Sequence, residues 1–171
     1  QGLTIGYTNG LDWPMLVKYY GNRNFTSKLI FHVSMPKPFR LAEQYLIRAE
    51  AYCRKNDFTK ASNDLTALRK MRYASGGTLN VSKNNWLQTI SDERVRELYM
   101  EGFRLHDLKR WGKEYADLNG GYSIRRTPQS CSQPEGSSLK ITPDNPLFVW
   151  PIPQHELESP GSEILPNESN R

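Results

Sequence analysis

Three glutamates that could do chemistry follow one another at a spacing of four residues: Glu93, Glu97 and Glu101. Carboxylates four residues apart lie on the same side of a helix, where they could act as an acid and a base or as metal ligands. A glycoside hydrolase, for example, needs two carboxyl groups roughly 5 to 9 Å apart across a cleft. The row therefore raises the hypothesis of an enzyme.

Arginines are interleaved with these glutamates, at positions 94, 96 and 104. A neighbouring arginine lowers the pKa of a carboxyl group, whereas a general acid needs a raised pKa. We therefore interpret the row as structural ion pairs and predict no catalytic residue. A hydrolase that uses Glu93, Glu97 and Glu101 is the weaker alternative.

The same stretch carries charges inside an apolar stripe. At about 100° per residue, Arg94, Glu97, Glu101 and Arg104 fall on one helix face. Five apolar residues fall within roughly 40° of Arg94 on that face, namely Leu87, Ile90, Leu98, Leu105 and Leu108. Burying an unpaired charge costs several kcal/mol. We therefore predict that the four charged residues form an ion-pair network with each other and with charges on a neighbouring helix.

Other residues that could do chemistry are scattered. His32, His106 and His155 lie far apart, without the HExxH or cysteine–histidine spacing of zinc sites. The sequence contains neither a GxSxG nucleophile motif nor a glycine-rich phosphate loop before a helix. We predict no metal and no cofactor.

Aromatic residues near the start of the chain are candidates for contact with a ligand. Trp13, Tyr19 and Tyr20 lie in a segment without helical periodicity. Flat aromatic rings provide surfaces on which sugar rings stack. The alternative is that these aromatics hold their loop against the core.

Three helices must position these residues. Apolar residues recur at helical spacing over residues 40–54 and 58–72, with Asp57 as the expected N-cap of the second helix. A long third helix is expected over residues 83–111, capped by Ser82, with a kink or close contact at Gly102. The spacing of aromatic and small residues in the first two helices fits a tetratricopeptide-like pair, and an ordinary helical hairpin is the alternative.

Irregular, proline-rich segments are expected at both ends of a mainly α fold. Helical periodicity stops after Gly112, and prolines interrupt most of the sequence beyond residue 142. An apolar run at residues 147–152 is expected to dock on the helices. We predict one domain over residues 1–171, with an aromatic lead-in at 1–39, a helical core at 40–112 and a loop and wrapping tail at 113–171.

Composition limits the classes of partner. The 171 residues carry a net charge of +5, but the basic residues do not cluster as they do in nucleic-acid-binding proteins, so we predict no nucleic-acid partner. No apolar run reaches the roughly 18 residues needed to cross a membrane. The chain opens on Gln1 without a methionine or a leader, so we expect a processed or truncated product.

Three blocks in this order resemble the C-terminal part of the SusD/RagB family: RLAEQYLIRAEAY at residues 40–52, DERVRELYMEGFRLHDLKRWG at 92–112 and NPLFVWPIPQHEL at 145–157. In the second block, the pattern ER, EL, EG, R, DL, RWG is matched from Glu93 to Gly112, and in the third the WPIP-E motif is matched from Trp150 to Glu156. Phe103 and Leu105-His106 depart from the usual arrangement around Arg104.

The resemblance implies a function in nutrient uptake. Members are helical lipoproteins on the outer face of the outer membrane that hold oligosaccharides, or in some members peptides, for a SusC-like TonB-dependent transporter, and they are not enzymes. It therefore implies an oligosaccharide or peptide ligand and a membrane attachment only through a lipid anchor outside this chain. The alternative from a different class is a structural or interaction module without a ligand of its own.

Overall fold

The computed structural model describes residues 3–6, 12–15, 37–75, 77–125 and 140–170. The chain divides into two compact units, Gln1–Arg40 and Leu41–Arg171. Their boundary lies next to the predicted end of the aromatic lead-in, while the single domain over the whole chain stays a prediction. Most of the described elements are helices, so the predicted mainly α fold is confirmed.

The first unit contains one described hairpin. Strand β1 (Leu3–Gly6) pairs antiparallel with β2 (Asp12–Met15), with Ile5 opposite Trp13. Trp13 is therefore part of a strand, whereas Tyr19 and Tyr20 lie outside the described residues.

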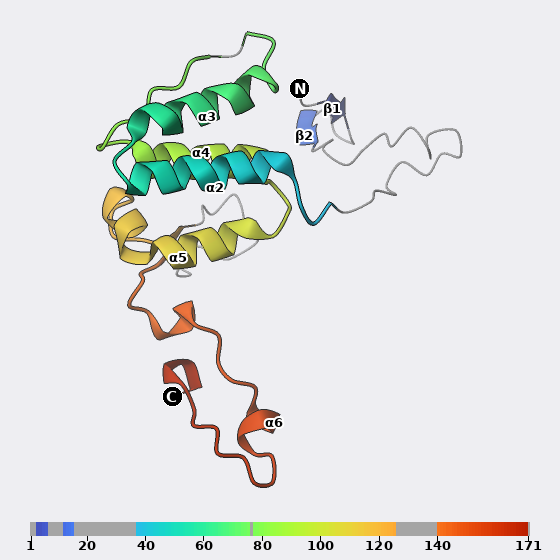
Figure 1. Cartoon of the computed structure of the whole chain (residues 1–171). Coiled ribbons are helices and arrows are strands. Elements are labelled where there is room, and N and C mark those ends of the chain that lie inside the picture. The colour runs from blue at the N-terminus through green and yellow to red at the C-terminus, as the bar shows by residue number, and fades with distance from the viewer. Residues whose placement is uncertain (1–2, 7–11, 16–36, 76, 126–139, 171) are drawn as a thin grey trace. The chain divides into compact units, whose positions relative to one another are not determined.

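The second unit begins with the predicted helix pair, α2 (Leu41–Arg54) and α3 (Phe58–Lys70), which lie side by side in Figure 1. The Asp57 carboxylate accepts a hydrogen bond from the Lys60 backbone N–H at 3.1 Å, so Asp57 is the N-cap as predicted. Ala49 and Ala61 are fully buried between neighbouring helices, where small side chains let helix axes approach closely. Leu41, at the start of α2, is 73% exposed.

The expected long third helix is wrong, because two helices take its place. Helix α4 (Trp86–Glu97) has Asn85 instead of Ser82 at its N-cap, and α5 (Phe103–Leu118) follows after a short break. Met100 and Gly102 have φ values of 60° and 83° in that break, which a continuous helix does not allow. Gly102 is the N-cap of α5, so the glycine marks a helix start and not a kink.

Helix α5 also extends past the predicted end at Gly112. Gly112 has φ 48° and ψ −121° inside α5, and helical structure resumes beyond it to Leu118. Glycine adopts this positive φ without the clash that a Cβ would cause. The helical core therefore includes residues that the sequence had assigned to a loop.

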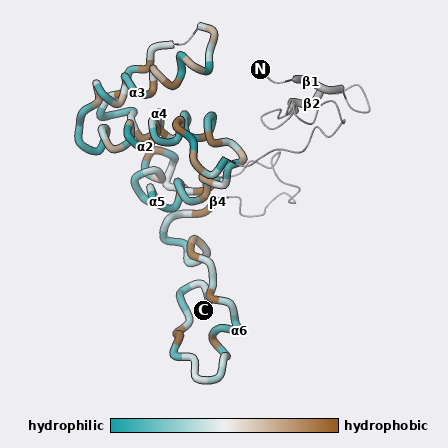
Figure 2. Tube along the Cα trace, turned by 45° about the vertical axis from the view of Figure 1, so that its right-hand side comes forward, coloured by the Kyte–Doolittle hydropathy of each residue, from teal (hydrophilic) through white to brown (hydrophobic). Residues whose placement is uncertain are grey.

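A single apolar core joins these four helices. Helix α2 packs against α3 and α4, and α4 packs against α5. Figure 2 shows hydrophobic and hydrophilic positions alternating along the helices, as expected when one side of each is buried. The core residues are Ala42, Leu46, Ala49, Cys53, Ala61, Leu65, Leu68, Val81, Leu87, Ile90, Leu98, Leu108, Trp111 and Tyr115.

Short elements follow α5. Strand β3 (Ile124–Arg125) pairs antiparallel with β4 (Lys140–Ile141). The chain then forms two short 3-10 helices, η2 (Pro146–Phe148) and η3 (Glu168–Asn170), with the four-residue helix α6 (Gln154–Leu157) between them. None of the described helices is long and apolar enough to cross a membrane.

Two asparagines form hydrogen bonds between distant parts of the C-terminal tail, residues 146–170. The Asn167 amide donates to the Trp150 carbonyl at 2.8 Å, and Asn170 both donates to the carbonyl and accepts from the N–H of Ile152. Trp150 is 72% exposed and Val149 is 59% exposed. These two side chains are therefore not buried on the helices, although the Phe148 and Trp150 rings each lie 5.9 Å from Lys109 Nζ of α5.

Candidate functional site

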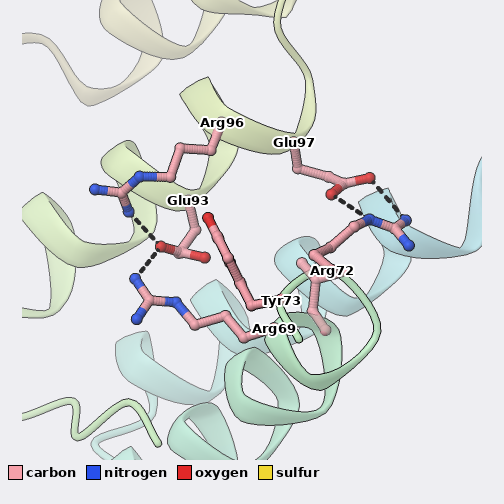
Figure 3. Close-up of a pocket in the computed structure, with 7 residues that line it drawn as sticks. Arg69, Arg72, Tyr73, Glu93, Arg96 and Glu97 are labelled. Carbon is pink, nitrogen blue, oxygen red and sulfur yellow. Dashed lines mark hydrogen bonds and ion pairs between the residues drawn. The ribbon is translucent and has the colours of Figure 1, made fainter. Parts of the chain in front are cut away.

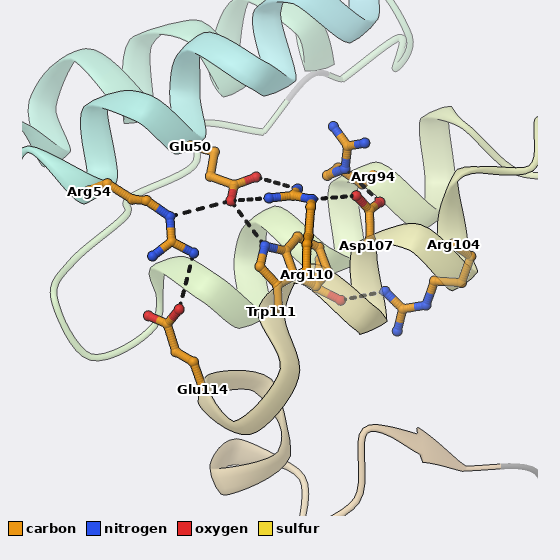
Figure 4. A network of polar contacts seen from close by, with 9 residues as sticks. Glu50, Arg54, Arg94, Arg104, Asp107, Arg110, Trp111 and Glu114 are labelled. Carbon is orange, nitrogen blue, oxygen red and sulfur yellow. Dashed lines mark hydrogen bonds and ion pairs between the residues drawn. The ribbon is translucent and has the colours of Figure 1, made fainter. Parts of the chain in front are cut away.

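A buried charge network links α2, α4 and α5 (Figure 4). Arg94 of α4 donates from Nε to Asp107 Oδ2 of α5 at 2.7 Å, and their side chains are 5% and 4% exposed. The other Asp107 oxygen accepts from Arg110 Nε at 3.0 Å. Arg110 then donates both terminal nitrogens to the Glu50 carboxylate of α2 at 2.6 Å each. Every buried carboxylate in this chain of contacts is paired, as burial requires.

Glu50 is held in its ionised form by this network. Burial alone would raise the pKa of Glu50, but hydrogen bonds from Arg110 and from the Trp111 indole N–H outweigh it and lower the pKa below its ordinary value. At the exposed end, Arg54 lies 3.6 Å from Glu50 and 3.0 Å from Glu114. Trp111 also stacks on Tyr115, with ring centroids 5.8 Å apart. The arrangement fixes α5 against the other helices.

The four charged residues singled out in the sequence have different surroundings. Arg94 pairs with Asp107, and Glu97 accepts two hydrogen bonds from Arg72, at 2.9 and 3.0 Å. Glu101 is half-buried in the break between α4 and α5. Arg104 instead donates to the hydroxyls of two uncharged residues. The break separates Arg104 from the α4 row, so the one-face arrangement expected for a continuous helix does not form.

Sequence reasoning missed Glu50, Asp107 and Arg110 as network members. A signal was available for Glu50, because it lies beside Ala49 and Leu46 on the apolar stripe of α2. The logic that singled out Arg94, a charge on a buried face, applies equally to this glutamate. The pairing itself joins residues up to 60 positions apart, which the spacing within one helix cannot give.

A pocket lies between α3 and α4 (Figure 3) and contains two of the three glutamates of the row. Glu93 accepts hydrogen bonds from Arg69, at 2.5 Å, and from Arg96. Glu97 faces Arg72, and the half-exposed Tyr73 lies beside them. Both glutamates of this pocket are hydrogen-bonded to arginine, so these two members of the row serve ion pairing. We call it the α3–α4 pocket.

A second and larger opening lies along α5, with a volume of about 390 Å³. We call it the α5 cavity, and its lining comes from Arg104, Leu105, Leu108, Tyr115 and Asn119 of α5 and from the following residues Tyr122, Ser123, Ile124 and Arg125. Its volume falls in the range of about 300 to 1,000 Å³ that is typical of small-molecule sites. The lining combines phenol rings, an amide and guanidinium groups, which suits a polar ligand with flat apolar faces.

Neighbouring groups hold the polar side chains of this cavity. Arg104 donates from Nη1 to Ser91 Oγ at 2.8 Å and from Nη2 to the Tyr115 hydroxyl at 2.9 Å. Asn119 donates its amide to the Tyr115 carbonyl at 2.9 Å, and Ser123 donates its hydroxyl to the Gly112 carbonyl at 3.3 Å. The kink at Gly112 therefore helps to place Ser123 in the wall.

Comparison with known proteins gives the family. A model of the SusD family matches residues 12–162. The chain belongs to the SusD family. This finding confirms the resemblance drawn from the three sequence blocks.

A curated relative of this SusD family chain is the starch-binding protein SusD of Bacteroides thetaiotaomicron, which is 37% identical over 111 residues. The match covers 63% of the chain and 18% of the relative, so the chain spans less than a fifth of that protein's length. No solved structure matches the chain.

The block at residues 92–112, which carries much of the resemblance, supplies Arg94, Asp107, Arg110 and Trp111 to the buried network. In this SusD family chain the motif therefore builds the fold. The same block also supplies Arg104, Leu105 and Leu108 to the lining of the α5 cavity, which Asn119 joins from beyond the block.

Proposed function

We propose that this chain is part of a cell-surface protein that binds oligosaccharide for uptake through a SusC-like TonB-dependent transporter. Membership of the SusD family and the starch-binding name of the relative support a carbohydrate ligand. The proposed location is the outer face of the outer membrane, with a lipid anchor outside this chain. A peptide ligand is the alternative within the family.

The α5 cavity is the observation that carries a binding role for the chain itself. Sugar rings present apolar faces that pack on aromatic rings and hydroxyls that need hydrogen-bond partners. Tyr115 and Tyr122 supply rings, while Asn119, Arg104 and Arg125 supply polar groups. The Asn119 side-chain amide nitrogen donates a hydrogen bond to the Tyr115 backbone carbonyl. Its side-chain oxygen is proposed to accept a hydrogen bond from a sugar hydroxyl.

The proposed protein binds its ligand without cleaving it. Hydrolysis of a glycosidic bond requires a carboxylic acid poised to protonate the leaving oxygen. Glu93 and Glu97 are each hydrogen-bonded to arginine, and the lining of the α5 cavity contains no carboxylate among the described residues. A ligand bound in the α5 cavity would contact aromatic rings and hydrogen-bond donors. It would not lie between two carboxyl groups that could act as an acid and a base.

Trp13, Tyr19 and Tyr20 remain proposed ligand contacts in the first unit. Each is proposed to offer a ring for sugar stacking, with a contribution of about 0.5 to 1.5 kcal/mol. Alanine variants at the three positions, compared by calorimetry on one glycan, measure that contribution. Unchanged affinity in all three would remove them from the site.

Calorimetry on the full-length protein tests the proposed function. The panel consists of neutral and acidic oligosaccharides and of peptides of matched size. We expect affinity for at least one oligosaccharide and a clear loss in the Tyr122→Ala variant, because Tyr122 lines the α5 cavity. Binding to peptides without binding to any oligosaccharide would replace the glycan proposal with the peptide alternative.

A further inference from the structure

The α5 cavity has an unbalanced charge. Arg104 and Arg125 line it, and none of the described lining residues is acidic. Lys140 lies close by, with its Nζ 4.9 Å from the centre of the Tyr122 ring. The α3–α4 pocket offers a contrast within the same molecule, since its three arginines are accompanied by Glu93 and Glu97.

Arg104 differs from every other arginine of α2–α5, helices that the structure describes in full. The other six each have a carboxylate oxygen within 4.0 Å: Arg48, Arg54, Arg69, Arg94, Arg96 and Arg110. Arg104 is instead hydrogen-bonded to the hydroxyls of Ser91 and Tyr115, which carry no charge. Among the described residues, no carboxylate forms an ion pair with this half-buried guanidinium. Burying a charge without a paired opposite charge costs free energy.

The position of Arg104 suggests where its counter-charge comes from. Its side chain lines the α5 cavity, and its guanidinium carbon lies 5.3 Å from the centre of the Tyr115 ring. Guanidinium groups bind carboxylates through two parallel N–H···O contacts, a geometry that a neutral hydroxyl cannot match. A carboxylate on a ligand would therefore supply the negative charge that pairs with Arg104.

We propose that the α5 cavity selects an acidic saccharide, in which one sugar unit carries a carboxylate that Arg104 binds. This inference rests on the proposed glycan-binding function and names the class of glycan. Arg125 strengthens the attraction to the same negative charge, while Tyr122 and Asn119 contact the neutral part of the ring. A neutral glycan fills the same cavity without meeting the charge of Arg104.

Calorimetry with matched acidic and neutral ligands tests the selectivity on the full-length protein. The acidic probes are oligogalacturonate, oligoglucuronate and oligomannuronate, and the neutral probes are the same oligosaccharides with their carboxylates reduced to alcohols. We expect at least one acidic probe to bind about tenfold or more tightly than its reduced form, because a hydrogen bond to a charged group typically contributes that much. Its affinity should also fall as salt is added.

Variants assign the selectivity to Arg104. Arg104→Gln should lose about tenfold or more in affinity for the preferred acidic probe and should bind the reduced probe as before. Lys113→Gln is the matched control, since it removes one positive charge from an exposed site of α5 that does not line the cavity. If Arg104→Gln does not fold, Arg125→Gln serves as the second variant, because Arg125 lies at an exposed position of the cavity lining. Its affinity for the acidic probe should fall a few-fold, and its affinity for the reduced probe should not change.

The outcomes separate this inference from the proposed function. If reduced probes bind as tightly as acidic ones, or if Arg104→Gln and Arg125→Gln leave the acidic preference intact, the inference is overturned while glycan binding stands. Binding of no oligosaccharide at all overturns the proposed function. Tight binding of a peptide through its terminal carboxylate, lost in Arg104→Gln, overturns the saccharide and assigns the cavity to peptides.

Discussion

Replacing Asp107 by leucine should destabilise the protein more than replacing Arg94 by methionine. Asp107 accepts hydrogen bonds from both Arg94 and Arg110, and the Arg94 side chain is only 5% exposed. Without the Asp107 carboxylate, Arg94 is buried with no counter-charge. Without Arg94, the same carboxylate still has Arg110 at 3.0 Å. The two partners of one ion pair are thus unequal.

The magnitudes follow from the cost of a buried charge. Removing one partner of a buried pair costs about 3 to 5 kcal/mol, so we expect about 4 kcal/mol for Asp107→Leu. The Arg94→Met variant keeps its remaining carboxylate paired, and we expect about 2 kcal/mol for it. Replacing both partners by apolar residues is often close to neutral, so the double variant should be more stable than Asp107→Leu alone.

Urea unfolding followed by tryptophan fluorescence measures these differences. With a slope of about 1 to 3 kcal/mol per molar urea, a loss of about 4 kcal/mol lowers the midpoint by roughly 1.3 to 4 M. Asp117→Asn is the matched control on α5, because it breaks the exposed pair with Lys113 and should cost no more than about 1 kcal/mol.

Two results would refute this reasoning. Equal destabilisation by Asp107→Leu and Arg94→Met would mean that Arg110 does not compensate for the loss of Arg94. A double variant less stable than Asp107→Leu would mean that Arg94 stabilises the protein by contacts other than its charge, such as the stacking of its guanidinium over the Phe103 ring at 5.8 Å.

Three further predictions concern acid, the helix kink and the buried thiol. The pKa of Glu50 in the folded protein lies below its ordinary value of 4.5. Its contribution to stability is therefore complete above pH 4.5 and is lost as pH falls through the folded pKa. In urea titrations at different pH values, the free energy of unfolding of Glu50→Gln should fall less steeply in acid than that of the unchanged protein. Gly112→Ala should cost about 1 to 3 kcal/mol through backbone strain alone, since an added Cβ meets no atom within 4 Å, and an unchanged urea midpoint would contradict this. Burial raises the pKa of Cys53 to about 11, so in a Cys131→Ser background a thiol reagent at pH 8 should label the protein only as fast as it unfolds.

The helix pair could be predicted from sequence because its signals are local. Apolar spacing gave both helices, and Asp57 marked the start of the second. The break between α4 and α5 could not be predicted in the same way, because helical periodicity continues through it. Gly102 was the only cue, and Met100 takes its positive φ without any preference of its residue type. Here tertiary packing, which buries Leu98 and Leu108 in one core, overrides the local pattern.

The candidate site was less predictable than the fold. Charges on a buried helix face showed that partners must exist, but Glu50 and Asp107 lie on other helices. The α5 cavity could not be predicted, because helical structure was expected to stop at Gly112, whereas Tyr115 of the continuing helix and the residues just after it form much of the lining. The cavity could be recognised only from the three-dimensional structure, in which α5 continues past the kink at Gly112.

Ser91 and Tyr115 hold the Arg104 side chain in one orientation before any ligand is present. A free arginine on a helix surface would lose about 1.5 to 2 kcal/mol of rotamer entropy when a ligand immobilises it. For Arg104 that entropy is already lost when the protein folds, so a bound ligand does not have to offset it again. Removing the Tyr115 hydroxyl should therefore weaken ligand binding through entropy, with little change in binding enthalpy, even though Arg104 itself is intact.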